Sequence, residues 1–105
     1  MDGNAIKDWD SFHDVFTEVF GFPDCYGRNM DAWIIRMMSI DDPDSSLTTV
    51  KVSEGENLTL EILNGGSLRK RCPEILDTLS NSLSLVDFRR IGAGKDPVLS
   101  LWYSI

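Results

Sequence analysis

Few side chains in this sequence are suited to acid–base or nucleophilic chemistry. There is one histidine, His13, and there are two cysteines, Cys25 and Cys72. Metal sites and catalytic nucleophiles usually show characteristic spacings, yet the CxxC, HExxH and GxSxG patterns are all missing. The phosphate-binding pattern GxxxxGK[ST] is missing as well. We therefore expect a protein that is not an enzyme and that uses no cofactor or metal.

The histidine and the cysteines also have structural explanations. His13 falls beside a predicted aromatic stripe, which indicates a hydrogen-bonded core histidine. Cys25 is either a small apolar contact or a reactive thiol in a loop. The N-terminus has no cationic segment followed by an apolar run, and no stretch of about 18 apolar residues occurs. We therefore expect a cytoplasmic protein with reduced thiols and no membrane contact.

Negative charge is concentrated in one part of the chain. The formal net charge is -7, and residues 1–46 hold ten Asp and Glu against three basic residues, whereas residues 47–105 hold seven of each sign. Carboxylates repel phosphates, so this asymmetry argues against direct nucleic-acid binding. It favours attraction to a basic protein, although acidic surfaces also serve solubility alone.

The stretch FPDCYGRNMDAWIIRMM, residues 22–38, predicts a loop followed by a helix. Asn29 is a favoured N-cap, and Asp31 lies in the first turn, where the helix dipole favours a negative charge. An apolar stripe at helical spacing would dock this helix on the core; it comprises Met30, Trp33, Ile34, Met37 and Met38. Ile35 falls off the stripe, on the side of Asp31. It is either an ordinary exposed apolar residue or part of a partner surface.

Two further helices are predicted. Aromatic residues at helical spacing indicate a helix over residues 9–20, with Asp8 or Asp10 as its cap and Gly21 as its stop. Pro73 suits the first position of a later helix over residues 73–83.

Four segments have β-strand character. LTTVKV (47–52) and LTLEIL (58–63) predict a hairpin, and residues 87–91 and 98–105 predict a closing one. Apolar groups on both faces of the last strand predict that it is central or well covered. If residues 58–63 and 98–105 are neighbours, the helices between them make the two strands parallel.

These elements predict one α/β domain over residues 1–105. It would have two layers, with a small, mostly parallel or mixed sheet packed against three to four helices. The expected core residues are Phe12, Phe16, Trp33, Met37, Leu60, Ile62, Leu76, Leu79, Leu101 and Tyr103.

One motif is specific enough to suggest a family. An apolar helix that carries His13 is followed by Phe22-Pro23-Asp24-x-Tyr26-Gly27-x-Asn29-Met30-Asp31-Ala32. This pattern resembles the barstar family of intracellular ribonuclease inhibitors. The resemblance is detailed over about 30 residues, and beyond Met37 it persists in the order of the elements.

The resemblance implies a barstar-like fold and a one-to-one complex with a basic ribonuclease. The second helix and the loop before it would block the active site of the enzyme, and the protein would be an immunity protein against a ribonuclease toxin. The expected partner-binding residues are Cys25, Tyr26, Asn29, Met30, Asp31, Ile34, Ile35, Met38, Asp41 and Asp42.

The chain departs from the family pattern in four places. The family usually has an aromatic residue at Cys25, a large residue such as Trp near Ile34, and a second Asp at Ile35. It also begins with a strand, which is short or missing here, so that residues 47–52 would take its edge position in a mixed sheet. The change at Ile35 leaves two hypotheses: a ribonuclease with an apolar pocket, or a regulatory module for a partner that is not a nuclease.

Overall fold

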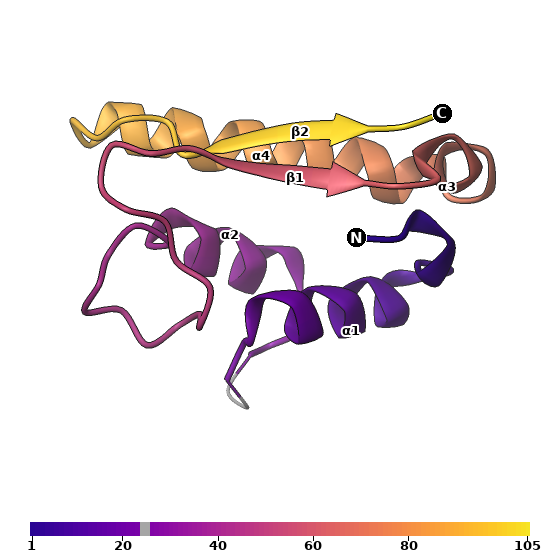
Figure 1. Ribbon diagram of the computed structural model, residues 1–105, viewed down its shortest axis with the longest axis horizontal. Helices are drawn as coiled ribbons and strands as arrows, with labels where there is room; N and C mark the ends of the chain where they lie inside the picture. The colour runs from indigo at the N-terminus through magenta and orange to yellow at the C-terminus, as the bar shows by residue number, and fades with distance from the viewer. Residues whose placement is uncertain (24–25) are drawn as a thin grey trace.

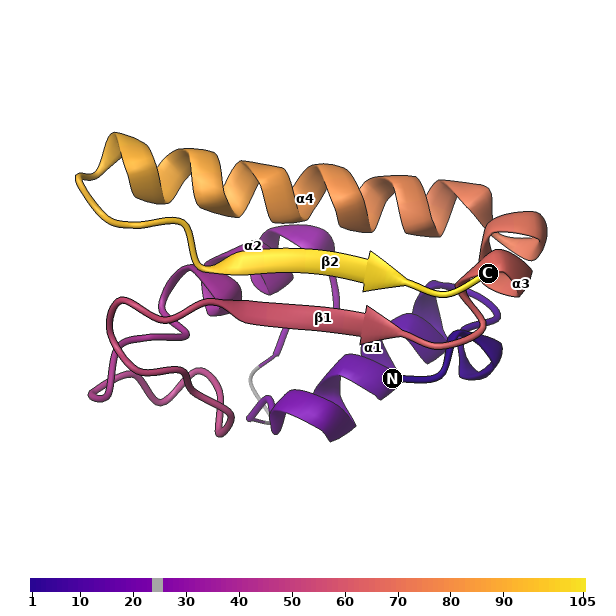
Figure 2. The same ribbon diagram turned by 45° about the horizontal axis from the view of Figure 1, so that its top comes forward.

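Helices and a small sheet form two layers in the computed structural model, which describes residues 1–23 and 26–105. The elements in chain order are a 3-10 turn η1 (Gly3–Ala5), α1 (Trp9–Phe20), α2 (Met30–Met38), β1 (Leu58–Ile62), α3 (Gly65–Arg71), α4 (Pro73–Gly92) and β2 (Leu99–Tyr103). Figures 1 and 2 show the two strands side by side, with α4 running along the sheet. α1 and α2 lie below β1 in Figure 1, and in Figure 2 α2 lies behind β2. The predicted α/β class is confirmed.

The sheet is parallel. β1 pairs with β2 from Leu58↔Leu99 to Ile62↔Tyr103, and α3 and α4 form the connection between the two strands. The N-terminal segment lies on the other edge of β1 through a parallel bridge between Asp2 and Leu63. The N–H of Leu63 donates to Met1 O at 2.8 Å. A short N-terminal segment therefore takes the edge position beside β1, and the mixed-sheet alternative is wrong.

The predicted hairpin over residues 47–52 and 58–63 is also wrong, because residues 47–52 form no strand. The N–H groups of Thr49 and Val50 donate to Phe20 O at 2.9 and 3.3 Å, and that of Val52 donates to Ile40 O at 3.1 Å. These bonds tie the segment to the ends of α1 and α2. The alternation of apolar and polar residues in LTTVKV therefore reflects a half-buried loop.

α4 continues to Gly92, so the predicted helix over residues 73–83 is too short and the strand over residues 87–91 is wrong. Val86 and Arg90 are buried and continue the helical spacing of Leu79 and Leu83, which extends the packed face. Asp87 connects this helix to β2, since its carboxylate accepts the N–H groups of Val98 and Leu99. No helix among the described residues has the length and apolarity to cross a membrane.

The helix ends follow their local signals. α1 has its predicted bounds, and Asp8 caps it in a capping box with Ser11. Gly21 ends it in the left-handed region, with φ of 63°. Asn29 caps α2, and its Oδ1 accepts the N–H of Ala32 at 2.8 Å.

The core contains most of the residues predicted for it. Phe12, Phe16, Trp33, Met37, Leu60, Ile62, Leu76 and Leu79 are buried. Leu101 is only half-buried and Tyr103 is 36% exposed. β2 is the outer strand among the described residues, so the prediction of a central or well-covered last strand is wrong.

Alanine substitutions at Gly21 and Gly55 distinguish two causes of destabilisation, a left-handed backbone and a steric clash. Both have positive φ, but a Cβ at Gly21 would lie 1.9 Å from Thr49 Oγ1, whereas a Cβ at Gly55 meets nothing within 4 Å. Gly55→Ala should lower the free energy of unfolding by about 1–2 kcal/mol. Gly21→Ala should lower it clearly further, as measured by urea denaturation. Equal losses for the two variants would show that α1 and Thr49 are not in close contact.

Candidate functional site

The loop before α2 is anchored in the core by Tyr26. Tyr26 is 7% exposed, and its Oη lies 2.6 Å from Nδ1 of the buried His13. Burial raises the pKa of Tyr26 to about 12. Burial also lowers the pKa of His13, with a smaller contribution from the nearby Arg28 charge. A neutral imidazole can accept the phenolic proton, so His13 acts here as a core histidine.

Two arginines fix the same loop from either side. The Arg36 guanidinium lies over the rings of Phe22 and Tyr26, 5.4 and 5.1 Å from their centroids. Arg28 reaches α1, where its Nη2 lies 2.8 Å from a carboxylate oxygen of Asp10 and 3.0 Å from one of Asp14. Arg28 thereby pairs with two acids of α1 and ties the loop before α2 to that helix.

The solvent side of α2 carries an acid and an apolar residue one turn apart. Asp31 is exposed and Ile35 is 57% exposed, which confirms that Ile35 lies off the packed stripe. Asn29 is exposed at the start of the helix, and Met30 and Met38 are half-buried at the borders. We call the surface formed by Asn29, Met30, Asp31, Ile35 and Met38 the α2 face.

Two of the predicted contact residues, Tyr26 and Ile34, are buried and do not contribute to the α2 face. Ile34 is 5% exposed and belongs to the core, as does Tyr26. Side chains with so little accessible surface have little area to offer a partner, because the packing of the domain already uses it. Cys25 and Asp24 lie outside the residues that the structure describes.

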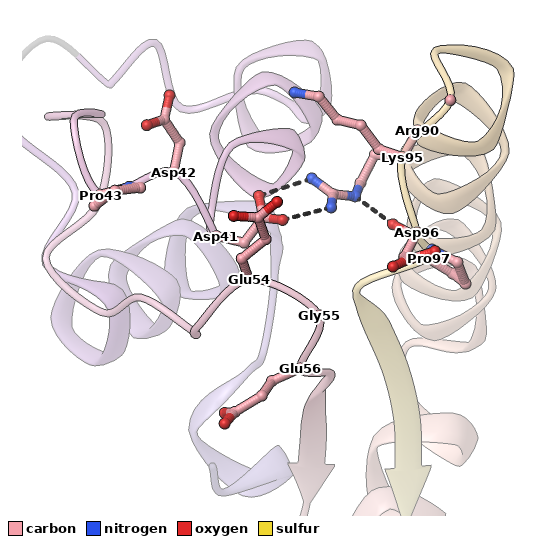
Figure 3. Close-up of a pocket in the computed structure, with 11 residues that line it drawn as sticks. Asp41, Asp42, Pro43, Glu54, Gly55, Glu56, Arg90, Lys95, Asp96 and Pro97 are labelled. Atoms are coloured by element: carbon pink, nitrogen blue, oxygen red, sulfur yellow. Dashed lines mark hydrogen bonds and ion pairs between the residues drawn. The ribbon is translucent and has the colours of Figure 1, made fainter.

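A cleft of about 310 Å³ lies beside the C-terminal end of α2 (Figure 3). Its walls come from α4 and from two loops, one between α2 and β1 and one between α4 and β2. The lining residues are Asp41, Asp42, Pro43, Glu54, Gly55, Glu56, Arg90, Gly94, Lys95, Asp96 and Pro97. Asp42, Glu54 and Glu56 are exposed, so acidic groups outnumber basic ones around its rim.

Arg90 occupies the base of this cleft with its charge fully paired. It pairs with Asp41 in a bidentate manner, at 2.7 and 2.9 Å, and the Arg90 side chain is 3% exposed. Arg90 also donates to the carbonyl oxygens of Met38 and Asp96, both at 2.8 Å. The hydrogen bonds from Arg90 lower the pKa of the Asp41 carboxyl. Asp41 is one of the expected partner-binding residues, and its carboxylate is already paired with Arg90.

The burial of Arg90 was not predicted from the sequence, although its position four residues after Val86 was the available signal. Asp42 differs from Asp41 because its side chain is exposed, and its carboxylate accepts the nearby N–H of Asp44 at 2.9 Å. Among the described residues, no group of three or more His, Cys, Asp or Glu could hold a metal ion. The α2 face and the exposed acids beside it are suited to contact with a protein surface.

The fold is that of a small α/β protein in which a capped helix exposes an acid and an apolar residue on its solvent side. Residues 1–90 match the family model of Barstar (barnase inhibitor), and the chain belongs to the barstar family. No protein among those with curated descriptions matches the chain. The resemblance inferred from the motif at residues 22–32 is thus confirmed, and the match extends from the N-terminus into α4.

Removal of the Asp41 carboxylate should leave a buried, uncompensated guanidinium. We expect Asp41→Asn to lower the free energy of unfolding by roughly 3–5 kcal/mol. The folded-state pKa of Asp41 is lowered, so its contribution is present above its ordinary pKa of 3.8 and is lost as the pH falls through the folded value. The variant should therefore lose less stability than the wild type on acidification, as measured by urea denaturation at several pH values.

Asp77→Asn is the matched control, because Asp77 lies 3.6 Å from Arg69 with both side chains well exposed. Asp77→Asn should lower the free energy of unfolding by no more than about 1 kcal/mol. Equal costs for the two variants would contradict the role assigned to Arg90.

Tyr26→Phe should leave the buried His13 Nδ1 without its hydrogen-bond partner, at a cost of about 1–3 kcal/mol of unfolding free energy. The raised pKa means that the Tyr26 contribution is complete below pH 10 and is lost as the pH rises toward 12. Tyr26→Phe should therefore lose less stability than the wild type as the pH rises over this range, as measured by thermal unfolding.

Tyr103→Phe is the matched control, because it removes an exposed hydroxyl bonded to Arg69. It should lower the free energy of unfolding by no more than about 0.5 kcal/mol. Equal effects would contradict the anchoring of the loop by Tyr26.

Proposed function

We propose that this protein inhibits a basic ribonuclease by binding it one-to-one and covering its active site with the α2 face and the loop before α2. The observation that carries the proposal is an exposed acid and an exposed isoleucine, Asp31 and Ile35, on a helix fixed at both ends in a chain of the barstar family. The protein would act as a binding partner and not as an enzyme.

The anchoring of α2 favours tight binding. Asn29 caps the start of the helix, and Arg90 bonds the carbonyl of its last residue, Met38. The loop before the helix is held by Tyr26. A surface that is already ordered loses less conformational entropy on association, so more of the contact energy appears as affinity.

Asp31 and Ile35 call for two different features on the partner. Asp31 would pair with a basic side chain in the active site, where the phosphates of RNA would otherwise lie. Ile35 stands where the family usually has a second Asp. An isoleucine against an arginine-rich pocket would leave buried cations unpaired, so the partner should present an apolar pocket to Ile35. The proposed contact residues are Asn29, Met30, Asp31, Ile35, Met38 and Asp42, together with Cys25 of the preceding loop.

The charge distribution supports a basic partner. Asp42, Glu54 and Glu56 add exposed acids beside the C-terminal end of α2. Such a surface raises the rate of encounter with a basic protein. A role as an immunity protein would place this activity in the cytoplasm, where a ribonuclease toxin would attack the RNA of the cell.

The second candidate is a regulatory module that uses the same face on a partner that is not a nuclease. Ile35 is the observation that favours it, because this position departs from the family at a place where a charge is expected. A pull-down from the source cells, followed by an RNA-cleavage assay of the captured proteins, distinguishes the two functions. A retained ribonuclease that is inhibited stoichiometrically supports the first function, and retained proteins without RNA-cleaving activity support the second.

Affinity for the retained ribonuclease should depend on the α2 face. We expect Asp31→Ala to weaken binding by about 2 kcal/mol or more, which is roughly 30-fold, in calorimetric titration. Ile35→Asp should weaken it as well, since a carboxylate would be desolvated in an apolar pocket. Glu18→Ala removes the same charge from an exposed position on α1 and should change affinity within about threefold. Tighter binding by Ile35→Asp, or a loss for Glu18→Ala as large as for Asp31→Ala, would contradict the proposed site.

The association rate should fall as salt is added, because the acidic surface attracts the basic enzyme over distances comparable with the Debye length. Stopped-flow measurements from about 10 mM to about 1 M salt, over which the Debye length falls from about 30 to 3 Å, test this. The dissociation rate should change much less. An association rate independent of salt would contradict electrostatic steering.

A further inference from the structure

The outer edge of β2 has hydrogen-bonding groups without a partner among the described residues. Leu58 N–H donates to Val98 O at 2.8 Å, and Ser104 N–H donates to Ile62 O at 3.1 Å. In a parallel ladder alternate residues face the neighbouring strand, so the even-numbered residues of β2 face β1. Leu101 and Tyr103 therefore direct their N–H and C=O groups away from the sheet.

This edge also lacks the usual protection against pairing. Residues 98–105 contain no charged residue and no proline. Trp102 is 52% exposed, and Ile105 is fully exposed. Edge strands in monomeric proteins are commonly blunted by lysine, proline, bulges or a covering loop, because an open apolar edge is a template for another strand.

We infer that β2 pairs antiparallel with β2 of a second copy of this chain, centred on Leu101. Because Leu101 directs both backbone groups outward, a two-fold axis at this residue lets the two copies exchange both hydrogen bonds. Leu99 then lies opposite Tyr103 of the other copy and accepts its N–H, while the Leu99 N–H stays bonded to Asp87. Ser100 lies opposite Trp102.

The charges at the two ends of the strand favour this arrangement. The Asp87 carboxylate lies at the start of β2, where it accepts the N–H of Leu99 at 3.2 Å. The Arg69 guanidinium lies at the other end, 5.6 Å from the centroid of the Tyr103 ring. Antiparallel pairing places Asp87 of each copy near Arg69 of the other, whereas parallel pairing would juxtapose like charges.

The acidic part of the chain does not oppose this contact. Residues 47–105 contain seven acidic and seven basic residues, so β2 and its flanking elements belong to the part without net charge. One pair of five-residue strands buries less than the roughly 1,200 Å² of a stable complex, so the dimer is weak and depends on concentration. The pairing uses no residue of the α2 face and stands independently of the proposed inhibition.

Sedimentation velocity of the full chain, from about 10 µM to about 1 mM, tests the inference over the range expected of a weak interface. The sedimentation coefficient should rise from that of a monomer toward that of a dimer. Trp102→Lys places a charge on the pairing edge and should keep the protein monomeric throughout. Phe88→Lys changes an aromatic residue on α4 that is 74% exposed, and it should leave the association unchanged.

Amide hydrogen exchange at the two ends of that range locates the contact. The amides of Leu101 and Tyr103 should become more protected at high concentration, and Arg69→Glu should reduce that gain. If the wild type stays monomeric over the whole range, the inference is wrong, and the edge of β2 would then be available to a strand of another protein. Association that persists in a folded Trp102→Lys variant, or that protects amides elsewhere only, also overturns it.

Discussion

One buried guanidinium joins the segments that position the α2 face. Arg90 joins α4 to the last residue of α2, to Asp41 in the following loop and to the turn before β2. A buried charge is tolerated only when it is fully paired, so these segments must take their places together. Because Met38 ends α2, the orientation of the α2 face depends on the same interaction. The cleft around Arg90 is thus a structural junction with exposed acids on its rim, beside the C-terminal end of α2.

Features that depend on neighbouring residues were predictable from the sequence. The bounds of α1, its cap at Asp8 and its stop at Gly21 follow from side chains within one turn of each helix end. The exposure of Ile35 follows from helical periodicity, since the packed stripe already accounts for one side of α2. The capped loop and helix also supplied the motif that resembles the barstar family, and that assignment is confirmed.

Features that depend on distant residues were not predictable. Residues 47–52 have a strand-like pattern, but the carbonyl oxygens of Phe20 and Ile40 take their N–H groups. Asp41 has the composition of a free surface acid, and only the fold brings Arg90 beside it. Tyr103 is apolar enough for a core, yet its strand lies at an open edge of the sheet. In each case the structure of the residue depends on segments that are distant in the sequence, either because they contact it or because they leave it exposed.

The proposed binding of a ribonuclease by the α2 face can be mapped without altering any side chain. Amide hydrogen exchange would be measured on this protein alone and saturated with the ribonuclease that it is proposed to inhibit. Binding through the α2 face should slow exchange in the loop before α2, in α2 itself from Asn29 to Met38, and near Asp42. Unchanged exchange in these segments, with protection confined to β2 or to the middle of α4, would contradict it.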